Sequence, residues 1–511
     1  MSLLRPKRID FHRRINLAGF RRLSQVAFFL LFLFFFFNLR DFRLNVPSDA
    51  FLLVSPLQTL TLLLSTGAFE LASLAAAALL LLTFFFGRFF CGWICPLGSC
   101  IDLADRFTAK RRSLHKSFRS LKYGLLIAIL VSALLSANLA GIFDPLSLMT
   151  RSLTTVMLPL FSALLFGAHH LTMRWEAAQE ISSSVITALQ KTVLPLQQPY
   201  FTDSFLILLL FVAILSAGLY SRRFWCRSVC PLGGLLALAA RSRRVTLQIK
   251  DDCRACGLCV DCRMGAVDPS WETDPAECIL CGECLQDCPD RARQLTLGGI
   301  SRPQPIDLSR RGVLFSIGLG GAAALFLQAR RVFAAPTTPI RPPGAVAEKE
   351  FLQTCLRCLA CVKACNTAGG CLQPLQFEAG LEALWTPAAR FQNGYCEYTC
   401  TLCGEVCPSG AIKPMTPEAK QSVRIGLAVF DRNRCIPWRQ GVECLVCEEH
   451  CPVPEKAIRF TETTIMENGK SRCVRLPYVV SELCIGCGIC EFKCPLKGEP
   501  GIRVFPNYGA A

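Results

Sequence analysis

The chain has 511 residues, of which 52% are hydrophobic, and its formal net charge is +17. This length is too great for one domain and suggests three or four. The 31 cysteines fall in short local runs, which argues against a disulfide framework. The basic residues lie beside apolar segments and form no aromatic-rich basic groove, so the charge does not indicate binding to nucleic acid.

Four apolar segments have the length and composition of membrane-spanning helices. They cover Leu23–Leu39, Leu71–Phe90, Tyr123–Phe143 and Ser204–Tyr220. Lys and Arg are concentrated before the first segment, between the second and third, and after the fourth, whereas the opposite loops are poor in them. The positive-inside rule therefore predicts that the N-terminus and the chain after the fourth segment lie in the cytoplasm.

A further apolar stretch, Leu153–Leu171, is interrupted by Pro159. Counting it as a span would invert the charge pattern downstream, so we expect a helix that lies on or dips into the outer face of the membrane. The stretch Leu52–Leu64, which contains Pro56, is interpreted in the same way.

Two matching motifs end the second and fourth apolar segments. We call residues 91–98 the first hook and residues 226–233 the second hook. Their sequences are Cys91-Gly-Trp-Ile-Cys95-Pro-Leu-Gly98 and Cys226-Arg-Ser-Val-Cys230-Pro-Leu-Gly233. Matching hooks at equivalent helix ends can converge on one site, where thiolates would bind a metal, ligate a further cluster or cycle through a disulfide. The alternative is that Pro and Gly only turn the chain and the cysteines are inert.

Six cysteine runs have the spacing of iron–sulfur proteins, as in Cys484-x2-Cys487-x2-Cys490-x3-Cys494-Pro. They form three pairs: module one (residues 251–298), module two (residues 355–407) and module three (residues 435–494). In two-cluster ferredoxins the last cysteine of each run binds the other cluster. The predicted ligand sets of module one are Cys253, Cys256, Cys259 with Cys288, and Cys278, Cys281, Cys284 with Cys262.

The same rule gives four ligand sets after residue 350, for a total of six [4Fe–4S] clusters. In module two they are Cys355, Cys358, Cys361 with Cys407, and Cys396, Cys400, Cys403 with Cys365. In module three they are Cys435, Cys444, Cys447 with Cys494, and Cys484, Cys487, Cys490 with Cys451. Three further cysteines, Cys100, Cys371 and Cys473, are expected to be small buried side chains.

Between modules one and two, Arg310 and Arg311 precede the uncharged stretch Gly312–Leu327. A twin-arginine pair before a short apolar run is typical of a bacterial export signal, and an ordinary fifth span is the alternative. Both interpretations place the chain after residue 335 on the outer side.

The predicted fold class is an α-helical membrane bundle, with about four spans plus one anchor helix, joined to α+β two-cluster ferredoxin-like modules. The predicted domains are residues 1–245 (membrane domain), 246–300 (cytoplasmic two-cluster module), 305–335 (signal or anchor helix) and 350–511 (periplasmic four-cluster region).

Two other features bear on function. Asp144, followed by Pro145, is expected near the outer interface, where its carboxylate would accept a proton from a quinol; more simply, Asp-Pro marks a turn. His169 and His170 do not indicate a haem, because the chain has only 5 histidines and a haem needs ligands that face one another across it.

At these residues the chain resembles a known family. Residues 1–300 resemble the NapH/MauN type of membrane ferredoxin, with four spans, paired hooks, the turn at Asp144 and a ferredoxin module. Residues 305–511 resemble NapG, with twin arginines and four cysteine runs, so that two separate chains of the quinol dehydrogenase family would here be fused. The resemblance implies a multi-subunit complex in the bacterial inner membrane that passes electrons from quinol to a periplasmic partner, such as a multihaem cytochrome or a reductase subunit.

The leading hypothesis is therefore a membrane redox subunit that relays electrons between the quinone pool and periplasmic acceptors. One alternative is an assembly or regulatory factor that matures a partner metalloenzyme, in which case the hook cysteines would handle a metal or a thiol. Another is that module one takes electrons from soluble donors and no quinone is involved.

Overall fold

The computed structural model describes residues 7–8, 16–37, 50–67, 73–107, 116–173, 176–192, 201, 204–250, 253–254, 256–268, 271–289, 292–297, 305–306, 308–333, 338–467 and 470–506. Much of the predicted basic N-terminal segment, and part of the basic loop before residue 116, lie outside these residues. The chain divides into two compact units, one of residues 1–152 with 205–328 and the other of residues 153–204 with 329–511.

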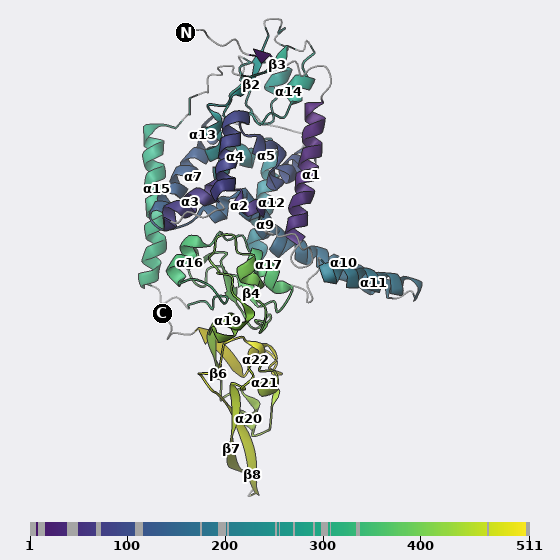
Figure 1. Ribbon diagram of the computed structural model, residues 1–511, viewed down its shortest axis with the longest axis vertical. Coiled ribbons are helices and arrows are strands. Elements are labelled where there is room, and N and C mark those ends of the chain that lie inside the picture. The colour runs from purple at the N-terminus through teal and green to yellow at the C-terminus, as the bar shows by residue number, and fades with distance from the viewer. Residues whose placement is uncertain are drawn as a thin grey trace. The chain divides into compact units, whose positions relative to one another are not determined.

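The first unit is mainly helical and carries one small sheet (Figure 1). Its helices are α1 (Leu17–Phe37), α2 (Ala50–Leu53), α3 (Pro56–Thr66), α4 (Ser73–Phe86), α5 (Phe89–Trp93), α6 (Pro96–Ala104), α7 (Lys116–Leu134), α8 (Ala140–Phe143), α9 (Pro145–Ser152), α12 (Ser204–Ser216), α13 (Pro231–Ala240), α14 (Glu283–Gln286) and most of α15 (Arg310–Phe333). Strands β1 (Lys7–Arg8), β2 (Val245–Ile249) and β3 (Arg293–Leu297) form an antiparallel sheet in the order β1-β3-β2.

The second unit contains short helices and three two-stranded sheets. Its helices are α10 (Leu158–Thr172), α11 (Glu176–Thr192), α16 (Glu348–Thr354), α17 (Ala360–Asn366), α18 (Leu402–Glu405), α19 (Pro417–Ser422), α20 (Ile436–Gln440), α21 (Val446–Glu449) and α22 (Ile489–Phe492). Its strands are β4 (Leu372–Pro374), β5 (Pro387–Ala389), β6 (Gly426–Phe430), β7 (Ile458–Glu467), β8 (Lys470–Val479) and β9 (Ile502–Pro506), paired as β4-β5, β6-β9 and β7-β8.

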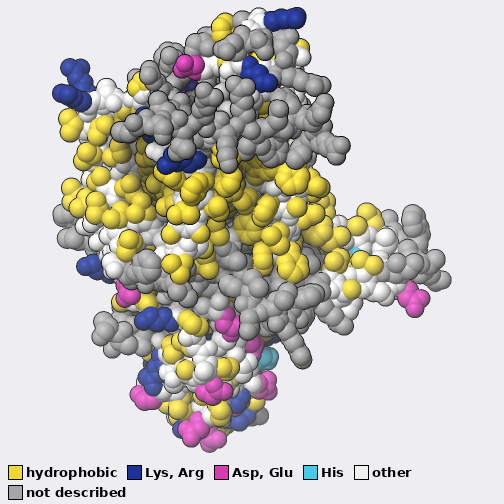
Figure 2. All heavy atoms as spheres, turned by 45° about the horizontal axis from the view of Figure 1, so that its top comes forward, with side chains coloured by type: hydrophobic (Ala, Val, Ile, Leu, Met, Phe, Trp, Pro, Cys, Tyr) yellow, Lys and Arg dark blue, Asp and Glu magenta, His cyan; other side chains and the backbone are white. Residues whose placement is uncertain are grey.

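Large apolar side chains point outward from the long helices of the first unit. The exposed fraction is 65% for Leu23 on α1, 62% for Leu81 on α4, 70% for Phe205 on α12 and 72% for Phe315 on α15. Figure 2 shows hydrophobic side chains gathered over the helical part of the molecule. An apolar surface of this kind is typical of helices that contact lipid.

Among the described residues, three helices are long and apolar enough to cross a membrane by length and composition: Leu17–Phe37, Pro145–Thr172 and Arg310–Gln328. Ser73–Phe86 and Ser204–Leu219, in the second and fourth predicted spans, are apolar but shorter. A fold with several apolar helices and ferredoxin-type modules was expected, and this coarse description is confirmed.

Two predicted segments can be compared with the helices of the structure. The third predicted span, Tyr123–Phe143, is divided between α7 and α8, since α7 ends at Leu134. The stretch Leu153–Leu171, expected on the outer face, is part of the helix Pro145–Thr172, which is long and apolar enough to be a span by length and composition; its place relative to the membrane stays a prediction. Pro159 does not end this helix, and the turn directly before it, Leu153–Met157, is π-helical, a local widening of the kind that accommodates an interruption of the regular hydrogen bonding.

The sheets hold the ends of the cysteine modules together. In module one, β2 and β3 pair from Val245 opposite Leu297 to Ile249 opposite Arg293, so the strands that flank the cysteine runs lie side by side. In module three, β6 pairs with β9. Modules one and three are therefore each closed by pairing of the strands that flank their cysteine runs, whereas β4 and β5 pair between the two runs of module two.

Candidate iron–sulfur sites

The two hooks fold in the same way, as a short helical turn followed by a helix that starts after a cysteine. Cys91 lies on α5 and Cys95 precedes α6, while Cys226 lies in a π-helical turn and Cys230 precedes α13. Cys95 and Cys230 are each followed by a proline, which suits the first position of a helix because that position needs no N–H donor. The four cysteines are between 4% and 8% exposed, so both hooks are buried.

The structure brings the four hook cysteines together. Cys95 interacts electrostatically with Cys91 and Cys226, and Cys230 interacts with all three of the others. The hooks therefore form a single four-thiol site from two distant parts of the chain.

Two arginines, each three residues before a hook, are exchanged between the hooks. Arg88, before the first hook, donates from Nη2 to the carbonyl oxygen of Cys226 at 3.0 Å. Arg223, before the second hook, donates from Nη1 to the carbonyl oxygen of Cys91 at 2.9 Å. Both side chains are fully buried. Each hook is thus held by the arginine of the other, in a reciprocal arrangement that the sequence repeat produces.

The final glycine of each hook leaves room for this arrangement. A Cβ on Gly98 would lie 2.8 Å from the carbonyl oxygen of Cys91, and a Cβ on Gly233 would lie 2.7 Å from Nη2 of Arg88. Both distances are shorter than real Cβ contacts, so a larger residue at either position would displace the backbone or the arginine.

Buried carboxylates neutralise both arginines. Asp102 accepts from Arg223 at 2.6 Å (Oδ1 to Nε) and from Arg21 at 2.9 Å (Oδ2 to Nη1). Glu277 accepts from Nη1 of Arg88 at 2.7 Å and also pairs with Lys122. Burial disfavours the Asp102 carboxylate, but Arg223 outweighs this effect and holds its pKa well below its usual range. The hooks therefore lie in a network of paired charges.

Module one lies against the first hook. Nε1 of Trp93, in the first hook, donates to the carbonyl oxygen of Ile279 at 3.2 Å. Nη1 of Arg243 donates to the carbonyl oxygen of Cys278 at 3.2 Å. Glu277, the partner of Arg88, directly precedes Cys278. The cysteine run that begins at Cys278 is therefore anchored to the four-thiol site through both its backbone and its preceding side chain.

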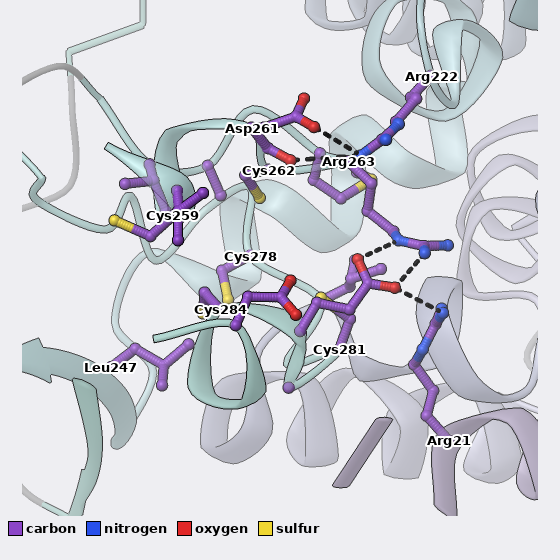
Figure 3. A pocket seen from close by; sticks show the side chains of 18 of the residues that line it. Arg21, Arg222, Leu247, Cys259, Asp261, Cys262, Arg263, Cys278, Cys281 and Cys284 are labelled. Atoms are coloured by element: carbon purple, nitrogen blue, oxygen red, sulfur yellow. Dashed lines mark hydrogen bonds and ion pairs between the residues drawn. The ribbon is translucent and has the colours of Figure 1, made fainter. Parts of the chain in front are cut away.

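A cavity of about 720 Å³ lies between module one and the helices of the first unit. Figure 3 shows Cys262, Cys278, Cys281 and Cys284 around it, together with Arg263. Cys262 interacts electrostatically with Cys278 and Cys281, and Cys284 with all three. The structure thus gathers the four members of one predicted ligand set.

The other predicted set of module one is described less completely. Cys256 and Cys259 line the same cavity, and Cys259 accepts from Nη2 of Arg293 at 3.3 Å. Cys253 and Cys288 are partly exposed. Their grouping with Cys256 and Cys259 stays a prediction.

The eight predicted ligands of module two fall into two groups, whose members interact electrostatically: Cys355, Cys358, Cys361 with Cys407, and Cys365, Cys396, Cys400 with Cys403. Those of module three fall into two more: Cys435, Cys444, Cys447 with Cys494, and Cys451, Cys484, Cys487 with Cys490. The structure therefore assembles each predicted quartet from two separate runs.

Two electrostatic interactions and one hydrogen bond link these four groups in order. Cys361 interacts with Cys403, joining the two groups of module two. The N–H of Cys396 donates to the carbonyl oxygen of Cys487 at 2.8 Å, joining module two to module three. Cys490 interacts with Cys447, joining the two groups of module three.

The chemistry of these groups fits iron–sulfur clusters. Among the described residues, no three His, Cys, Asp or Glu side chains are close enough to bind a single metal ion. A cubane instead spreads four thiolates over its iron corners, one to each. Burial raises the pKa of Cys281 and of Cys447 to about 12, so these thiols are protonated at neutral pH and release protons when a metal binds.

The remaining cysteines behave differently from one another. Cys371 is 2% exposed, as expected, but it lies beside the predicted ligand Cys365. Cys100 is only partly buried. Cys473 is exposed, so the expectation that it is buried was wrong. It lies on β8, which pairs with β7.

Asp144 is fully buried at the start of α9. Its carboxylate accepts from Ser55 Oγ at 2.7 Å, Gln58 Nε2 at 2.8 Å and the N–H of Leu146 at 3.1 Å. These contacts are those of a helix-capping aspartate, and a quinol role stays a prediction. His169 Nδ1 lies 3.1 Å from Ser182 Oγ, on the neighbouring helix α11.

Comparisons with known proteins agree with these sites. A family model described as a 4Fe-4S binding domain matches residues 70–115 and 204–248, so each matched segment contains one hook. The chain is 36% identical over 173 residues to the methylamine utilization ferredoxin-type protein MauM of Methylorubrum extorquens, covering 33% of this chain and 73% of MauM. It is 38% identical over 169 residues to the ferredoxin-type protein NapG of Escherichia coli, covering 33% of this chain and 70% of NapG.

The chain belongs to the MauM/NapG family of ferredoxin-type proteins. The resemblance drawn from the cysteine runs and hooks is thereby confirmed. Protein NirI of Paracoccus denitrificans is also similar, at 30% identity over 212 residues, which covers 39% of this chain and 25% of NirI. No solved structure matches the chain. Membership of a ferredoxin-type family indicates iron–sulfur electron transfer.

Sequence reasoning missed the charged residues around the hooks. Arg88 and Arg223 stand at the same distance before Cys91 and Cys226, in the repeat Arg-x2-Cys-x3-Cys-Pro-x-Gly. Extending the comparison of the two hooks by three residues would have found them. The partner Glu277 carries no such signal, because it lies 189 residues from Arg88.

Proposed function

We propose that this chain is a membrane-bound iron–sulfur protein that relays electrons between the quinone pool and acceptors on the outer side of the bacterial inner membrane. Module one would lie in the cytoplasm, and modules two and three in the periplasm. Six [4Fe–4S] clusters would be held by the predicted ligand sets, with a further cluster at the hooks. The acceptor would be a periplasmic redox partner in a multi-subunit complex.

One observation carries the proposal. The four-thiol site at the hooks, which follows two apolar helices, is anchored to the cysteine run of module one by Trp93, Arg88 and Glu277. A redox group at the hooks would therefore have a cluster as its immediate neighbour. A purely structural turn needs no such connection.

The order of thiol groups in the second unit supports a relay. Electrostatic interactions and one hydrogen bond join the group of Cys355 to that of Cys365, then to that of Cys484 and finally to that of Cys435. Clusters bound there would form a row. Such a row suits the passage of single electrons over a distance.

The clusters would take up the electrons of a quinol one at a time. Oxidation of one quinol releases two electrons and two protons, and each [4Fe–4S] cluster takes up one electron. The chain's own residues would bind the quinol, hold the hooks together through Arg88 and Arg223, and accept the protons. Asp144 is the predicted proton acceptor.

The test uses the full-length chain, purified without air in detergent with its clusters intact. We expect added quinol to decrease the visible absorption of the clusters and to produce the EPR signals of their reduced forms. If dithionite reduces the clusters and quinol does not, the chain is not a quinol oxidant.

The same experiment distinguishes this function from the alternative, an assembly factor that matures a partner metalloenzyme. In that case quinol would leave the clusters oxidised, while a hook variant such as Cys95→Ser would abolish the activity of a partner metalloenzyme. If a soluble donor reduces module one and quinol does not, the chain takes its electrons from the cytoplasm.

A further inference from the structure

Five thiols, rather than four, gather at one predicted cluster site of module two. A single cavity is lined by Cys365, Cys396, Cys400, Cys403 and also by Cys371. The Sγ atoms of Cys365 and Cys371 are 3.9 Å apart. Cys371 also interacts through its side chain with Cys396. It is 2% exposed, so its thiol is shielded from water.

A tight turn delivers Cys371 to this position. The carbonyl oxygen of Cys365 accepts from the N–H groups of Ala368, Gly369 and Gly370, at 3.0, 3.1 and 2.9 Å. The chain thereby folds back on itself, so that Cys371 returns to Cys365. Gly369 is needed there, because a Cβ would overlap the carbonyl oxygen of Tyr395. The position of the fifth thiol is thus set by a tight turn, which is closed by these three hydrogen bonds.

A cubane has four iron corners, and each takes one cysteine. Cys396, Cys400 and Cys403 supply three from one run, and Cys365 supplies the fourth by the crossing rule. Cys371 then has no corner left to bind. A neutral thiol has one S–H donor, and the sulfurs of Cys365 and Cys396 are the acceptors within its reach.

We propose that Cys371 is a positioning residue that binds no iron, donates an S–H hydrogen bond to a ligand sulfur of this cluster and raises its reduction potential. The inference rests on the proposed ligand sets. A hydrogen bond to sulfur stabilises the reduced cluster, which carries one more negative charge, more than the oxidised one. Burial strengthens the effect because water does not compete for the sulfur.

Two neighbouring groups would also raise the reduction potential of this cluster. The sulfur of Cys365 also accepts from the backbone N–H of Leu372. Lys420, which is 4% exposed, interacts with Cys396 and adds a positive charge. The predicted cluster at Cys365 would therefore be easier to reduce than one without such donors, and it stands inside the row rather than at its end.

The test is a redox titration of the full-length protein, followed by EPR, with dithionite and chemical mediators in place of quinol. In Cys371→Ala we expect one cluster to become harder to reduce. Loss of one hydrogen bond to a charged acceptor predicts roughly a tenfold fall in the ratio of reduced to oxidised cluster at a fixed potential. This corresponds to a shift of about 59 mV for a one-electron couple.

Three variants complete the test. Cys371→Ser keeps a donor, so its titration should lie closer to that of the unmodified protein. Cys473→Ala, which removes an exposed thiol on β8, should change nothing. The signal that shifts should be the one that Cys400→Ala removes.

Two results would overturn the proposal. One is an unchanged titration in Cys371→Ala. The other is the loss of a whole cluster's iron in Cys371→Ala, which would make Cys371 a ligand. Because no quinol is used, a failure of quinol to reduce the protein leaves both results interpretable.

Discussion

The guanidinium group of Arg88 donates to the carbonyl oxygen of Cys226 at 3.0 Å, and thereby ties the start of the first hook to the second. Arg223 makes the matching contact with Cys91. Because each arginine serves the other hook, neither hook can hold its cysteines in place alone. The four-thiol site therefore depends on both arginines.

We expect Arg88→Gln to open the site. The substitution removes one of the two cations that form ion pairs with the buried Glu277 among the described residues, and breaking a buried pair costs about 3–5 kcal/mol. Cys226 and Cys230 should then react with a maleimide at a rate well above that of the unmodified protein. The measurement is mass spectrometry of the alkylated peptides after timed exposure.

The matched control is Arg222→Gln. Arg222 adjoins Arg223 in sequence, but its side chain is 24% exposed and its ion pair with Asp261 lies at the surface. An exposed pair contributes about 0.2–1 kcal/mol, so labelling of Cys226 should not change. Equal labelling in Arg88→Gln and Arg222→Gln would mean that the exchanged arginines do not hold the hooks closed.

The hook cysteines should be required for reduction by quinol. In Cys95→Ser we expect quinol to lose its ability to reduce the clusters, while dithionite still reduces them, because the six predicted ligand sets do not include Cys95. Stopped-flow absorbance with each reductant measures this. Cys100→Ser provides the control on the same helix, since Cys100 belongs to no group of interacting thiols. Normal reduction of Cys95→Ser by quinol would remove the hooks from the relay.

Asp102→Asn should destabilise the first unit. The carboxylate pairs with Arg21, Arg223 and Arg263. Glu283 also pairs with Arg21 and Arg263, so removal of the Asp102 charge chiefly affects the buried Arg223, and breaking such a buried pair costs about 3–5 kcal/mol. We expect a lower Tm in detergent, measured by the near-ultraviolet circular dichroism of the first unit. An unchanged Tm would show that the arginines find other partners.

The same residue predicts a dependence on pH. The pKa of Asp102 is lower in the folded protein than its ordinary value of 3.8. Its contribution to stability is therefore fully present above the ordinary value and is lost as the pH falls below it. The difference in Tm between the unmodified protein and Asp102→Asn should shrink on acidification below that value, and a constant difference would contradict the assignment.

Iron content can test whether a cluster takes its fourth ligand from the other cysteine run of its module. Cys407 and Cys358 belong to one predicted set, although they lie in different runs, and each is replaced by alanine. Each replacement should remove or damage the same cluster, and the double variant should lose no more than about four iron atoms per chain. Chemical iron analysis with EPR measures this. If the double variant loses about twice as much iron as either single one, the two residues serve different clusters.

The sequence was sufficient to predict the features that depend on the local spacing of residues. The run that begins at Cys484 predicts a cluster-binding loop, because its short gaps allow several sulfurs to face one cluster. The hooks were recognised because Cys-Pro at a helix start repeats. The helix ends were less predictable: the third apolar segment looks continuous, but α7 ends at Leu134, since composition alone does not reveal where tertiary packing turns the chain.

Features that depend on distant contacts were not predictable. Nothing near Glu277 indicates that it faces Arg88, because their pairing follows from how module one lies on the helices. Cys371 was expected to be an ordinary buried residue, and its burial was predicted correctly. Its place beside Cys365 depends on the turn between them, which local spacing alone does not reveal.

The pairing of early and late cysteines has a consequence for biosynthesis. In the proposed quartet of Cys435, Cys444 and Cys447, the last member is Cys494, which is synthesised after the other three. That cofactor can be inserted only once the chain has been made past Cys494. If module three is exported as proposed and is loaded in the cytoplasm, the machinery that carries it across the membrane would have to accept a folded, iron-loaded cargo.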